Sequence, residues 1–304
     1  MPVEGILPVI PTPFLDGRFD ADSFRRFLDH MLPFVDGYTL LGSTGEASSL
    51  TTAERQAVTE AALAMTPEDK LVVVGVSHTS AAESVSLAQH AERAGASAVL
   101  CCAPYYFLNS SAGILSYLEP LDAALGIDLV LYDNPVSTKT VIQAEWILDW
   151  AAKLERLTAV KLTDHNLAKI ELCQAAGLRV LAGDDSIVFR YLTAGVDGAM
   201  VIAPAIFPEA FQETWALMRE ANQAGALKVF SERILPFTHV FGIGDEVATS
   251  KAILHEVGIF ASADLLPPLI PVGADRRSLL RAAYDLCHSN DEHRSAESVS
   301  LEGG

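Results

Sequence analysis

The sequence predicts an α/β protein, a (β/α)8 TIM barrel with a small C-terminal helical extension. Short apolar segments rich in β-branched residues alternate with segments of helical periodicity, and eight of the former occur between residues 5 and 203. Such alternation indicates βα units and a parallel sheet, and eight units fit a closed barrel. An open doubly wound sheet is the alternative. It is disfavoured because the first strand leads into PTPFLDG and not into a G-x-G-x-x-G fingerprint.

The elements follow one another in a regular order. Strands are expected at residues 5–10, 38–42, 71–76, 97–103, 127–133, 158–162, 179–183 and 197–203. Helical spacing follows Thr52, and again Ser80, where the segment ends at Gly95, a typical helix stop. Thr51 and Glu54 have the spacing of a capping box, which predicts a helix start there.

Four more helical segments follow the eighth strand. They read FPEAFQETWALMREANQAG, ALKVFSERILPFTHVFG, EVATSKAILHEVG and DRRSLLRAAYDLCHS. We interpret them as the last barrel helix and a helical extension. The expected organisation is a barrel over residues 1–224, an extension over 225–290 and a polar, disordered tail over 291–304.

The composition excludes several classes of protein. Half of the 304 residues are hydrophobic, as in globular proteins, and the net charge of −18 argues against nucleic acid or an anionic membrane as partner. No apolar run is long enough to span a membrane, and the N-terminus lacks the features of a secretory signal, so a cytoplasmic location is expected. Cys101, Cys102, Cys173 and Cys287 lack the paired spacing of a zinc site. Buried free thiols and no metal are expected.

The most unusual residue of the predicted strands is Lys161. It lies within TAVKLTD, a strand of a composition that is normally buried. Burial disfavours the charged ammonium, and a neutral amine can attack a carbonyl carbon and form an imine. The alternative is an outward-facing lysine in a salt bridge, or one that snorkels past the end of the barrel.

Two other strand ends carry groups that suit the same chemistry. Active sites of such barrels form at the C-terminal ends of the strands. The second strand leads into GSTGE, where backbone N–H groups around Ser43, Thr44 and Gly45 could bind a carboxylate or a phosphate. The fifth ends in YDNP, and its Tyr132 presents a phenol. Taken singly, these fit an ordinary turn and a core or rim tyrosine. Together with Lys161 they form a specific combination, because an imine-forming amine needs a carboxylate site and a proton carrier.

The same segments carry a family resemblance. GSTGE at 42–46, PYY at 104–106, YDNP at 132–135, the VK pair ending at Lys161 and GDD at 183–185 resemble the dihydrodipicolinate synthase and N-acetylneuraminate lyase family. The resemblance covers residues from about 4 to 290. It implies a (β/α)8 barrel with a helical extension, commonly a tetramer of tight dimers, and therefore a homo-oligomer. It implies neither a cofactor nor a metal.

The resemblance also implies class I aldolase chemistry. Lys161 would form a Schiff base with pyruvate or another 2-oxo acid, and the enamine derived from it would make or break a C–C bond. By match to the family motif, Tyr132 would be the general acid/base. Its proton relay would pass through Ser43 and Tyr106, and Tyr106 would reach into the site of the neighbouring subunit.

On the substrate side the sequence departs from the family. The N–H groups of Ser43 and Thr44 would hold the substrate carboxylate, and the carbonyl of Met200 would face the lysine. Ser137, however, stands where dihydrodipicolinate synthases usually carry an arginine that grips the carboxylate of the aldehyde. A hydroxyl does not replace that bidentate contact. We therefore expect a lyase or aldolase that cleaves or forms a C–C bond with a hydroxylated, sugar-acid-like aldehyde.

Three alternatives remain open. The first is dihydrodipicolinate synthase itself, condensing pyruvate with aspartate semialdehyde, with Lys139 in place of the arginine. The second is a dehydratase or deaminase that uses the same imine on a 2-oxo-3-deoxy acid or a cyclic imine acid. The third is a silent sensor of 2-oxo acids, which would need no proton relay. A phosphate-handling barrel is disfavoured, because Asp184 and Asp185 are expected to cap the next helix.

Overall fold

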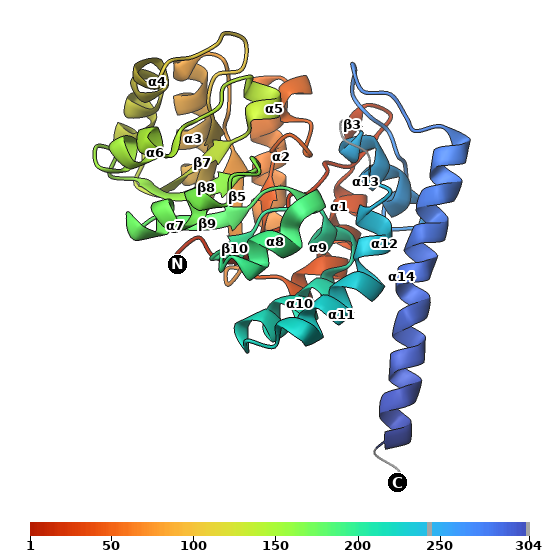
Figure 1. Ribbon diagram of the computed structural model, residues 1–304. Helices are drawn as coiled ribbons and strands as arrows, with labels where there is room; N and C mark the ends of the chain where they lie inside the picture. The colour runs from red at the N-terminus through yellow and green to blue at the C-terminus, as the bar shows by residue number, and fades with distance from the viewer. Residues whose placement is uncertain (242–244, 302–304) are drawn as a thin grey trace. The chain divides into compact units, whose positions relative to one another are not determined.

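The chain folds into two compact units. The computed structural model describes residues 1–241 and 245–301, with side chains up to residue 289 (Figure 1). The first unit consists of Met1–Thr12 and Val35–Ile202, and we call it the barrel unit. The second consists of Pro13–Phe34 and Ala203–Gly304, and we call it the helical unit.

The barrel unit contains one sheet of eight parallel strands. They are β1 (Gly5–Ile6), β4 (Gly37–Leu40), β5 (Leu71–Gly75), β6 (Ala98–Cys102), β7 (Asp128–Asp133), β8 (Leu157–Leu162), β9 (Arg179–Ala182) and β10 (Gly198–Ala199). Their order in the sheet is β1-β10-β9-β8-β7-β6-β5-β4. Past the end of β1, Val9 forms a parallel bridge with Thr39 on β4, which joins the two edges. The sheet is therefore a nearly closed barrel, and the predicted fold class is confirmed.

Helices follow the strands of this unit and lie outside them (Figure 1). They are α2 (Thr52–Met65), α3 (Ala81–Ala94), α4 (Ser111–Ala123), α5 (Pro135–Thr138), α6 (Ala144–Ala151), α7 (Ala168–Ala175) and α8 (Val188–Thr193), with short 3-10 turns at Ala47–Ser49 and Asp185–Ile187. The predicted capping box is present, since Thr51 and Glu54 exchange side-chain and backbone hydrogen bonds. Gly95 ends α3 with a φ of 101°. That left-handed conformation favours glycine, which explains the stop.

The helical unit begins with a hairpin that the sequence analysis missed. Its strands are β2 (Phe14–Leu15) and β3 (Arg18–Phe19), and Asp16 and Gly17 between them both have positive φ. An Asp-Gly pair between two apolar segments is a strong hairpin signal. The helices of the unit are α1 (Ala21–Met31), α9 (Ala203–Ile206), α10 (Pro208–Arg219), α11 (Gln223–Arg233), α12 (Leu235–Thr238), α13 (Glu246–Glu256) and α14 (Ala274–Leu301), with a 3-10 turn at Leu32–Phe34.

Apolar packing holds the helical unit together. Phe27 of α1 meets Phe260 edge to face, with 5.3 Å between ring centres. The helix α14 packs against α11, α12 and α13. The predicted boundaries at residues 224 and 290 stay predictions. The predicted disorder of residues 291–304 also stays a prediction. The helical backbone of α14 continues to Leu301, and residues 302–304 lie outside the described residues.

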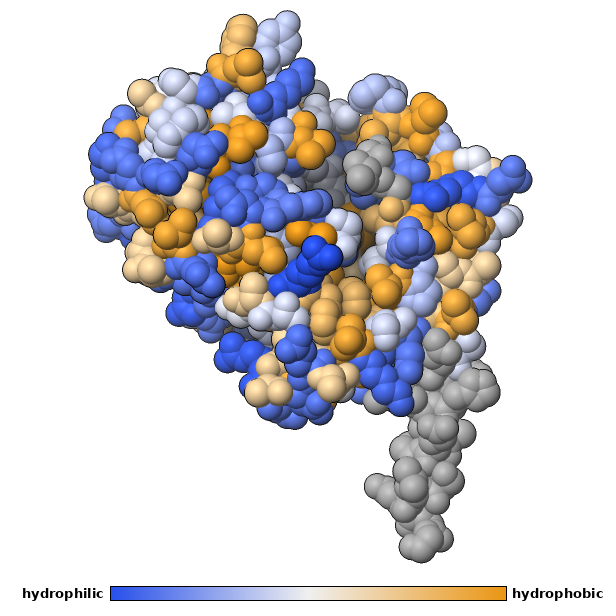
Figure 2. Space-filling view, in the orientation of Figure 1, coloured by the Kyte–Doolittle hydropathy of each residue, from blue (hydrophilic) through white to orange (hydrophobic). Residues whose placement is uncertain are grey.

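Two general expectations concern the surface and the thiols. In Figure 2, hydrophilic and hydrophobic residues are interspersed over the visible face of the barrel unit. Among the described residues, no helix is long and apolar enough to cross a membrane. The four cysteines are buried free thiols, as predicted.

Candidate active site

The pairing of β6, β7 and β8 brings three side chains together. Lys161 lies in register with Tyr132, and Tyr132 lies in register with Cys102. Residues in register project from the same face of a sheet, while the next residue along projects from the other. The Nζ of Lys161 lies 4.1 Å from the centre of the Tyr132 ring. Asp133, one residue on, therefore points away from the amine.

Burial makes Lys161 a weak base. The residue is 3% exposed, and desolvation lowers the pKa of its amine to about 7. The charges of Asp185 and Asp184 oppose this shift without overcoming it. In the part of the chain that the structure describes, Lys161 forms no ion pair. The alternative of an outward-facing lysine in a salt bridge is thus wrong, and a large fraction of the amine is neutral near pH 7.

Tyr132 is held by two hydrogen bonds. Its phenol is buried, which raises its pKa, and hydrogen bonds with Ser43 and Asn134 act in the opposite direction. The Nδ2 of Asn134 donates to the Tyr132 Oη over 3.0 Å. Ser43 therefore lies near enough to the phenol to act on its pKa, and its part in a proton relay stays a prediction. The structure also adds Asn134, which appears in the sequence analysis only as part of the quoted YDNP segment.

The turn after β4 presents free backbone donors. Its shape depends on Gly45: a Cβ there would lie 2.9 Å from the backbone of Leu41, and the Gly45 carbonyl accepts from the hydroxyl of Thr12 over 2.8 Å. Within the described residues, the N–H groups of Ser43 and Thr44 donate no hydrogen bond. Two free N–H groups on adjacent residues suit a carboxylate oxygen.

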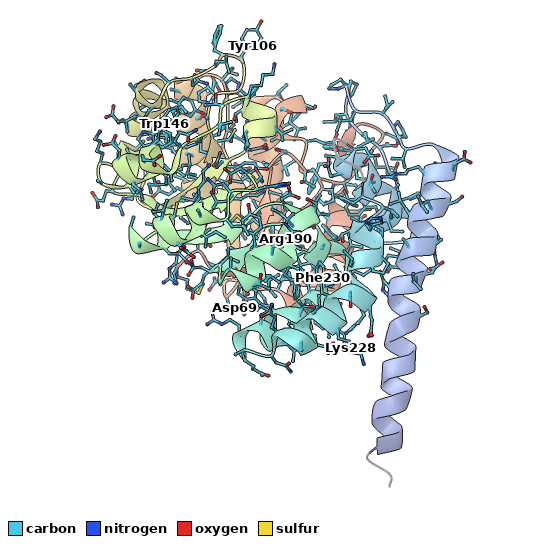
Figure 3. The ribbon with its side chains drawn as sticks, viewed as in Figure 1. Asp69, Tyr106, Trp146, Arg190, Lys228 and Phe230 are labelled. Carbon is cyan, nitrogen blue, oxygen red and sulfur yellow. The ribbon has the colours of Figure 1, made fainter. Side chains whose placement is uncertain are left out.

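Tyr106 does not join this cluster within its own chain. It lies at the outer end of the loop between β6 and α4, with 77% of its surface exposed (Figure 3). Its ring packs edge to face on Phe107, with 5.0 Å between centres. Leu108 is also exposed, and hydrophobic residues stand out from the same end of the barrel unit in Figure 2. The role of Tyr106 in the proton relay of a neighbouring subunit stays a prediction.

The remaining substrate-side residues lie on α5 and after β10. Ser137 is exposed, and its Oγ accepts from Asn134 Nδ2 over 3.0 Å. Lys139 is exposed and ends α5 in a left-handed conformation. Met200 is fully buried, and its N–H donates to the Ala182 carbonyl. That the Met200 carbonyl faces the lysine stays a prediction.

Two carboxylates of GDD have different partners. Asp184 accepts from the Ser186 N–H over 2.8 Å and caps the following 3-10 turn, as predicted. Its other oxygen lies 3.1 Å from the Nε2 of His165. Asp185 accepts from the Ile202 N–H over 2.9 Å and so fixes the chain after β10. The prediction that Asp185 also caps the next helix is wrong, since α8 begins at Val188 without a side-chain cap hydrogen bond.

A second buried lysine lies on the opposite face of the same strands. Lys169 of α7 donates to Asp133 over 2.7 Å and also contacts Asp164. These carboxylates raise the pKa of Lys169, and burial raises the pKa of Asp133 to about 6. The sequence analysis missed this cluster. Its one local signal is the aspartate of the YDNP segment, a carboxylate at the end of a buried strand.

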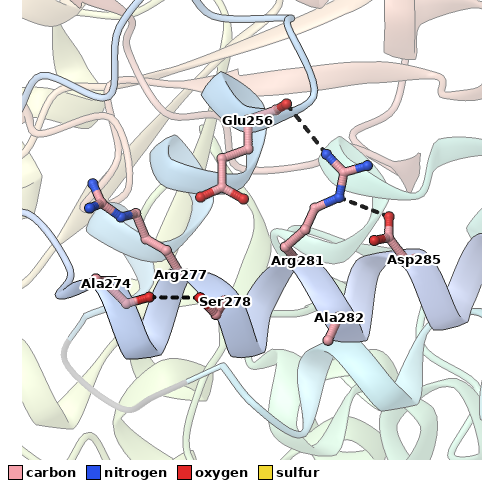
Figure 4. Close-up of a pocket in the computed structure, with 7 residues that line it drawn as sticks. All are labelled: Glu256, Ala274, Arg277, Ser278, Arg281, Ala282 and Asp285. Atoms are coloured by element: carbon pink, nitrogen blue, oxygen red, sulfur yellow. Dashed lines mark hydrogen bonds and ion pairs between the residues drawn. The ribbon is translucent and has the colours of Figure 1, made fainter.

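A separate surface pocket lies in the helical unit. It is lined by α14 and Glu256, and Arg281 there donates to Asp285 over 2.8 Å and to the Glu256 carbonyl (Figure 4). Because a carboxylate already faces that arginine, the pocket offers little to an anion. In the described part of the chain, no cluster of metal-ligating side chains occurs.

Comparison with known proteins identifies the family. Residues 2–285 match the dihydrodipicolinate synthetase family. The chain belongs to that family. It is therefore an enzyme, a lyase of the class I aldolase type.

Several relatives cover nearly the whole chain. A 4-hydroxy-tetrahydrodipicolinate synthase from Methanococcoides burtonii is 31% identical over 283 residues, which is 91% of this chain and 96% of the relative. One from Rhodopseudomonas palustris is 28% identical over 92% of this chain and 95% of its own. Among solved structures, YagE, a prophage protein of the dihydrodipicolinic acid synthase family from E. coli K12 in complex with pyruvate, has a TM-score of 0.86 and 26% identity, covering 93% of this chain and 98% of YagE.

Proposed function

We propose that this lyase forms a Schiff base between Lys161 and pyruvate or another 2-oxo acid. The observation that carries the proposal is a buried amine, 4.1 Å from the ring centre of a buried tyrosine, that forms no ion pair with the residues the structure describes. Burial leaves a large fraction of such an amine neutral and nucleophilic near neutral pH. The relative solved in complex with pyruvate supports the choice of ligand.

The first half of the reaction makes the imine. The free N–H groups of Ser43 and Thr44 bind the carboxylate of the 2-oxo acid, and Lys161 attacks the keto carbon to give a carbinolamine. Tyr132 gives its proton to the carbinolamine hydroxyl, with Ser43 as its relay partner. The C–O bond breaks, water leaves and a protonated imine remains.

The second half makes or breaks a C–C bond. The phenolate of Tyr132 takes a proton from the carbon next to the imine, which gives an enamine and restores the phenol. The enamine carbon attacks the aldehyde carbonyl, and the new alkoxide takes a proton from Tyr132. Hydrolysis of the product imine then frees Lys161. The reverse sequence cleaves the same bond.

We propose aspartate semialdehyde as the aldehyde. The support is the name shared by the curated relatives, 4-hydroxy-tetrahydrodipicolinate synthase, over more than nine tenths of this chain. A carboxylate on this aldehyde needs a cation, and Lys139 at the end of α5 is an exposed one.

A second candidate is a hydroxylated, sugar-acid-like aldehyde. The observation that favours it is Ser137, whose exposed hydroxyl lies one hydrogen bond from Asn134 and two from the phenol of Tyr132. A serine offers a hydroxyl but no charge, which suits a hydroxylated substrate better than a carboxylate.

We also propose that the functional form is a homo-oligomer. Three consecutive large apolar side chains, those of Tyr106, Phe107 and Leu108, are each more than 70% exposed. A second copy of the chain would cover them and receive Tyr106 near its own site. One relative is described as a monomeric dihydrodipicolinate synthase variant, so the assembly varies within the family.

The decisive experiment traps the imine. The protein is incubated with pyruvate and borohydride, and the adduct is located by peptide mass spectrometry. We expect a reduced pyruvyl group on Lys161, and the same adduct at full yield in the control variant Lys153→Met, which removes an exposed lysine. An adduct only with longer 2-oxo acids would favour a dehydratase or deaminase, and no adduct with any 2-oxo acid would overturn the proposal. Assays with pyruvate plus aspartate semialdehyde, or plus glyceraldehyde, then separate the two aldehydes.

A further inference from the structure

One buried amide beside the proposed catalytic tyrosine has all of its hydrogen-bonding atoms occupied. Asn134 is 7% exposed, and its Oδ1 accepts from the backbone N–H of Ser137 over 3.2 Å. Its Nδ2 donates to the Tyr132 Oη and to the Ser137 Oγ, both over 3.0 Å. An amide nitrogen carries two hydrogens, so both are used.

These contacts fix which way the amide faces. A backbone N–H can only donate, so the atom of Asn134 next to the Ser137 N–H must be the oxygen. The nitrogen then necessarily faces the two hydroxyls. A flipped amide would put an N–H group against the backbone N–H and leave a buried donor unpaired, which costs about 1–3 kcal/mol.

The orientation of the amide decides where two protons can go. Because Asn134 donates to the oxygens of Tyr132 and Ser137, neither hydroxyl can direct its own hydrogen at that nitrogen. The hydrogen of Tyr132 is left for the nearby Ser43, which acts on the pKa of the phenol, or for a bound substrate. The hydrogen of Ser137 is left for an acceptor beyond the exposed face of α5.

We propose that Asn134 is a positioning residue that presents the Tyr132 and Ser137 hydroxyls as proton donors. The proposal rests on the proposed function and deepens it. Tyr132 releases its proton during loss of water from the carbinolamine, and the N–H of Asn134 then stabilises the phenolate by a charge-assisted hydrogen bond. Ser137 donates to an acceptor oxygen of the aldehyde half, either a hydroxyl or a carboxylate oxygen.

A simpler role for Asn134 makes a different prediction. Asn134 precedes α5 and caps it through the Ser137 N–H. Aspartate caps a helix as well as asparagine does. If capping were the whole role, Asn134→Asp would be silent. In our proposal that variant is severely impaired, because a carboxylate only accepts and would draw the hydrogens of both hydroxyls toward itself.

The test compares rates of imine formation. Rapid-quench borohydride trapping with pyruvate is followed by mass spectrometry for the wild type, Asn134→Asp and a matched control, Asn222→Asp. Asn222 caps α11 in the helical unit through the Gly225 N–H over 3.0 Å, so the control makes the same change at another cap. We expect Asn134→Asp to slow the adduct by about 10²-fold at pH 8, within the range of general acid–base effects. The control, at an exposed cap, should react at the wild-type rate and keep the wild-type Tm, and rates for Asn134→Asp are normalised to its folded fraction because its carboxyl is buried.

A pH series adds a readout that capping alone would not move. Below the pKa of the introduced carboxyl the group regains a hydrogen to donate, so the ratio of wild-type to Asn134→Asp rates should fall on acidification. The titratable groups that act on Tyr132 are Lys161, Cys102 and Asp184, and they are present in both proteins. A carboxylate at position 134 would also favour the charged form of Lys161, so Asn134→Ser, which adds no charge, is measured beside Asn134→Asp. Asn134→Asp should also raise the KM of the aldehyde, since Ser137 loses its role as a donor.

Each outcome decides between the proposals. A wild-type rate in Asn134→Asp overturns the positioning role and leaves the cap. Absence of an adduct in the wild type overturns the proposed function, and the inference with it. If Asn134→Asp does not fold, Asn134→Ser replaces it. Serine can cap but cannot donate to both hydroxyls, so a wild-type rate there also overturns the inference.

Discussion

Two buried lysines, eight residues apart, have opposite acid–base behaviour. Lys161 on β8 is 3% exposed and Lys169 on α7 is 2% exposed, so both have lost nearly all their contact with water. Burial alone lowers the pKa of an amine. The pKa of Lys161 is lowered to about 7, whereas that of Lys169 is raised. Burial acts against the charged amine in both cases, and only around Lys169 do the carboxylates outweigh it.

The partners are separated by the two faces of the strands. Asp133 and Asp164 form ion pairs with Lys169. The charges of Asp185 and Asp184 act on Lys161, but among the described residues none forms an ion pair with it. Asp133 directly follows Tyr132 on β7, and successive side chains point to opposite faces. A shift of the register by one residue would turn Asp133 toward Lys161. The alternation of the strand therefore keeps the reactive amine free of a carboxylate contact.

The largest expected effect comes from removing the reactive amine. Lys161→Met keeps the length of the side chain but leaves no nucleophile. We expect no borohydride-trapped adduct and no C–C bond activity above background. Because the substitution also removes a buried amine that lacks an ion pair, the free energy of unfolding should stay level or rise. Adduct formation in this variant, at any lysine, would place the chemistry elsewhere.

The same substitution at the second lysine should have the opposite consequence. Lys169→Met leaves Asp133 and Asp164 buried without their cation. Breaking a buried ion pair from one side destabilises by about 3–5 kcal/mol. Urea unfolding of the two methionine variants, measured side by side at pH 8, tests this. A Lys169→Met protein as stable as Lys161→Met would show that the ion pairs contribute nothing to the fold.

The pH dependence of imine formation sharpens the comparison further. Only neutral Lys161 attacks the keto carbon, so the trapping rate should rise about tenfold per pH unit below pH 7 and level off above it. Initial rates from pH 5.5 to 9.5 give the profile. A rate that still climbs above pH 9 would mean that the lysine has its ordinary pKa.

The lowered pKa of Lys161 also predicts how the stability of the fold changes with pH. Between about pH 7 and 10.5 the unfolded lysine binds a proton that the folded Lys161 has lost. Stability therefore rises with pH across this window. The free energy of unfolding of the wild type should rise with pH relative to that of Lys161→Met. The other titratable groups are the same in both proteins, so their contributions largely cancel in the difference. Lys169 has the opposite sign, and its contribution is lost as pH rises through its raised pKa.

The sequence predicts those features that depend on local pattern. Strand positions follow from apolar, β-branched segments, and the reactive lysine is visible because a charge in such a segment is chemically unusual. Two strands, β1 and β10, are shorter than expected by four or more residues, since only Gly5–Ile6 and Gly198–Ala199 pair as regular ladder. The hairpin after Thr12 was missed although its Asp-Gly turn is a recognisable signal.

What the sequence does not reveal depends on where side chains point and on contacts between distant segments. The role of Asn134 requires knowing that its amide meets the Tyr132 phenol and the Ser137 hydroxyl at once. The cluster around Lys169 requires knowing that Lys169 of α7 meets Asp133 at the end of β7. In both cases the residue types are ordinary for a loop or a helix. For Tyr106 the sequence suggests a role that a single chain does not test, because that role needs a second chain.

The smallest expected effect concerns a charge that acts on Lys161 without an ion pair. Asp185 is the first of the groups that favour the charged amine. In Asp185→Asn the amide oxygen can still accept from the Ile202 N–H, so the backbone contact after β10 is kept while the charge is lost. The pKa of Lys161 should fall further, and the trapping profile should move toward acid by up to about one pH unit. That is less than the one to three units typical of close opposite charges. A shift toward alkali would mean that Asp185 acts on the lysine through structure and not through its charge.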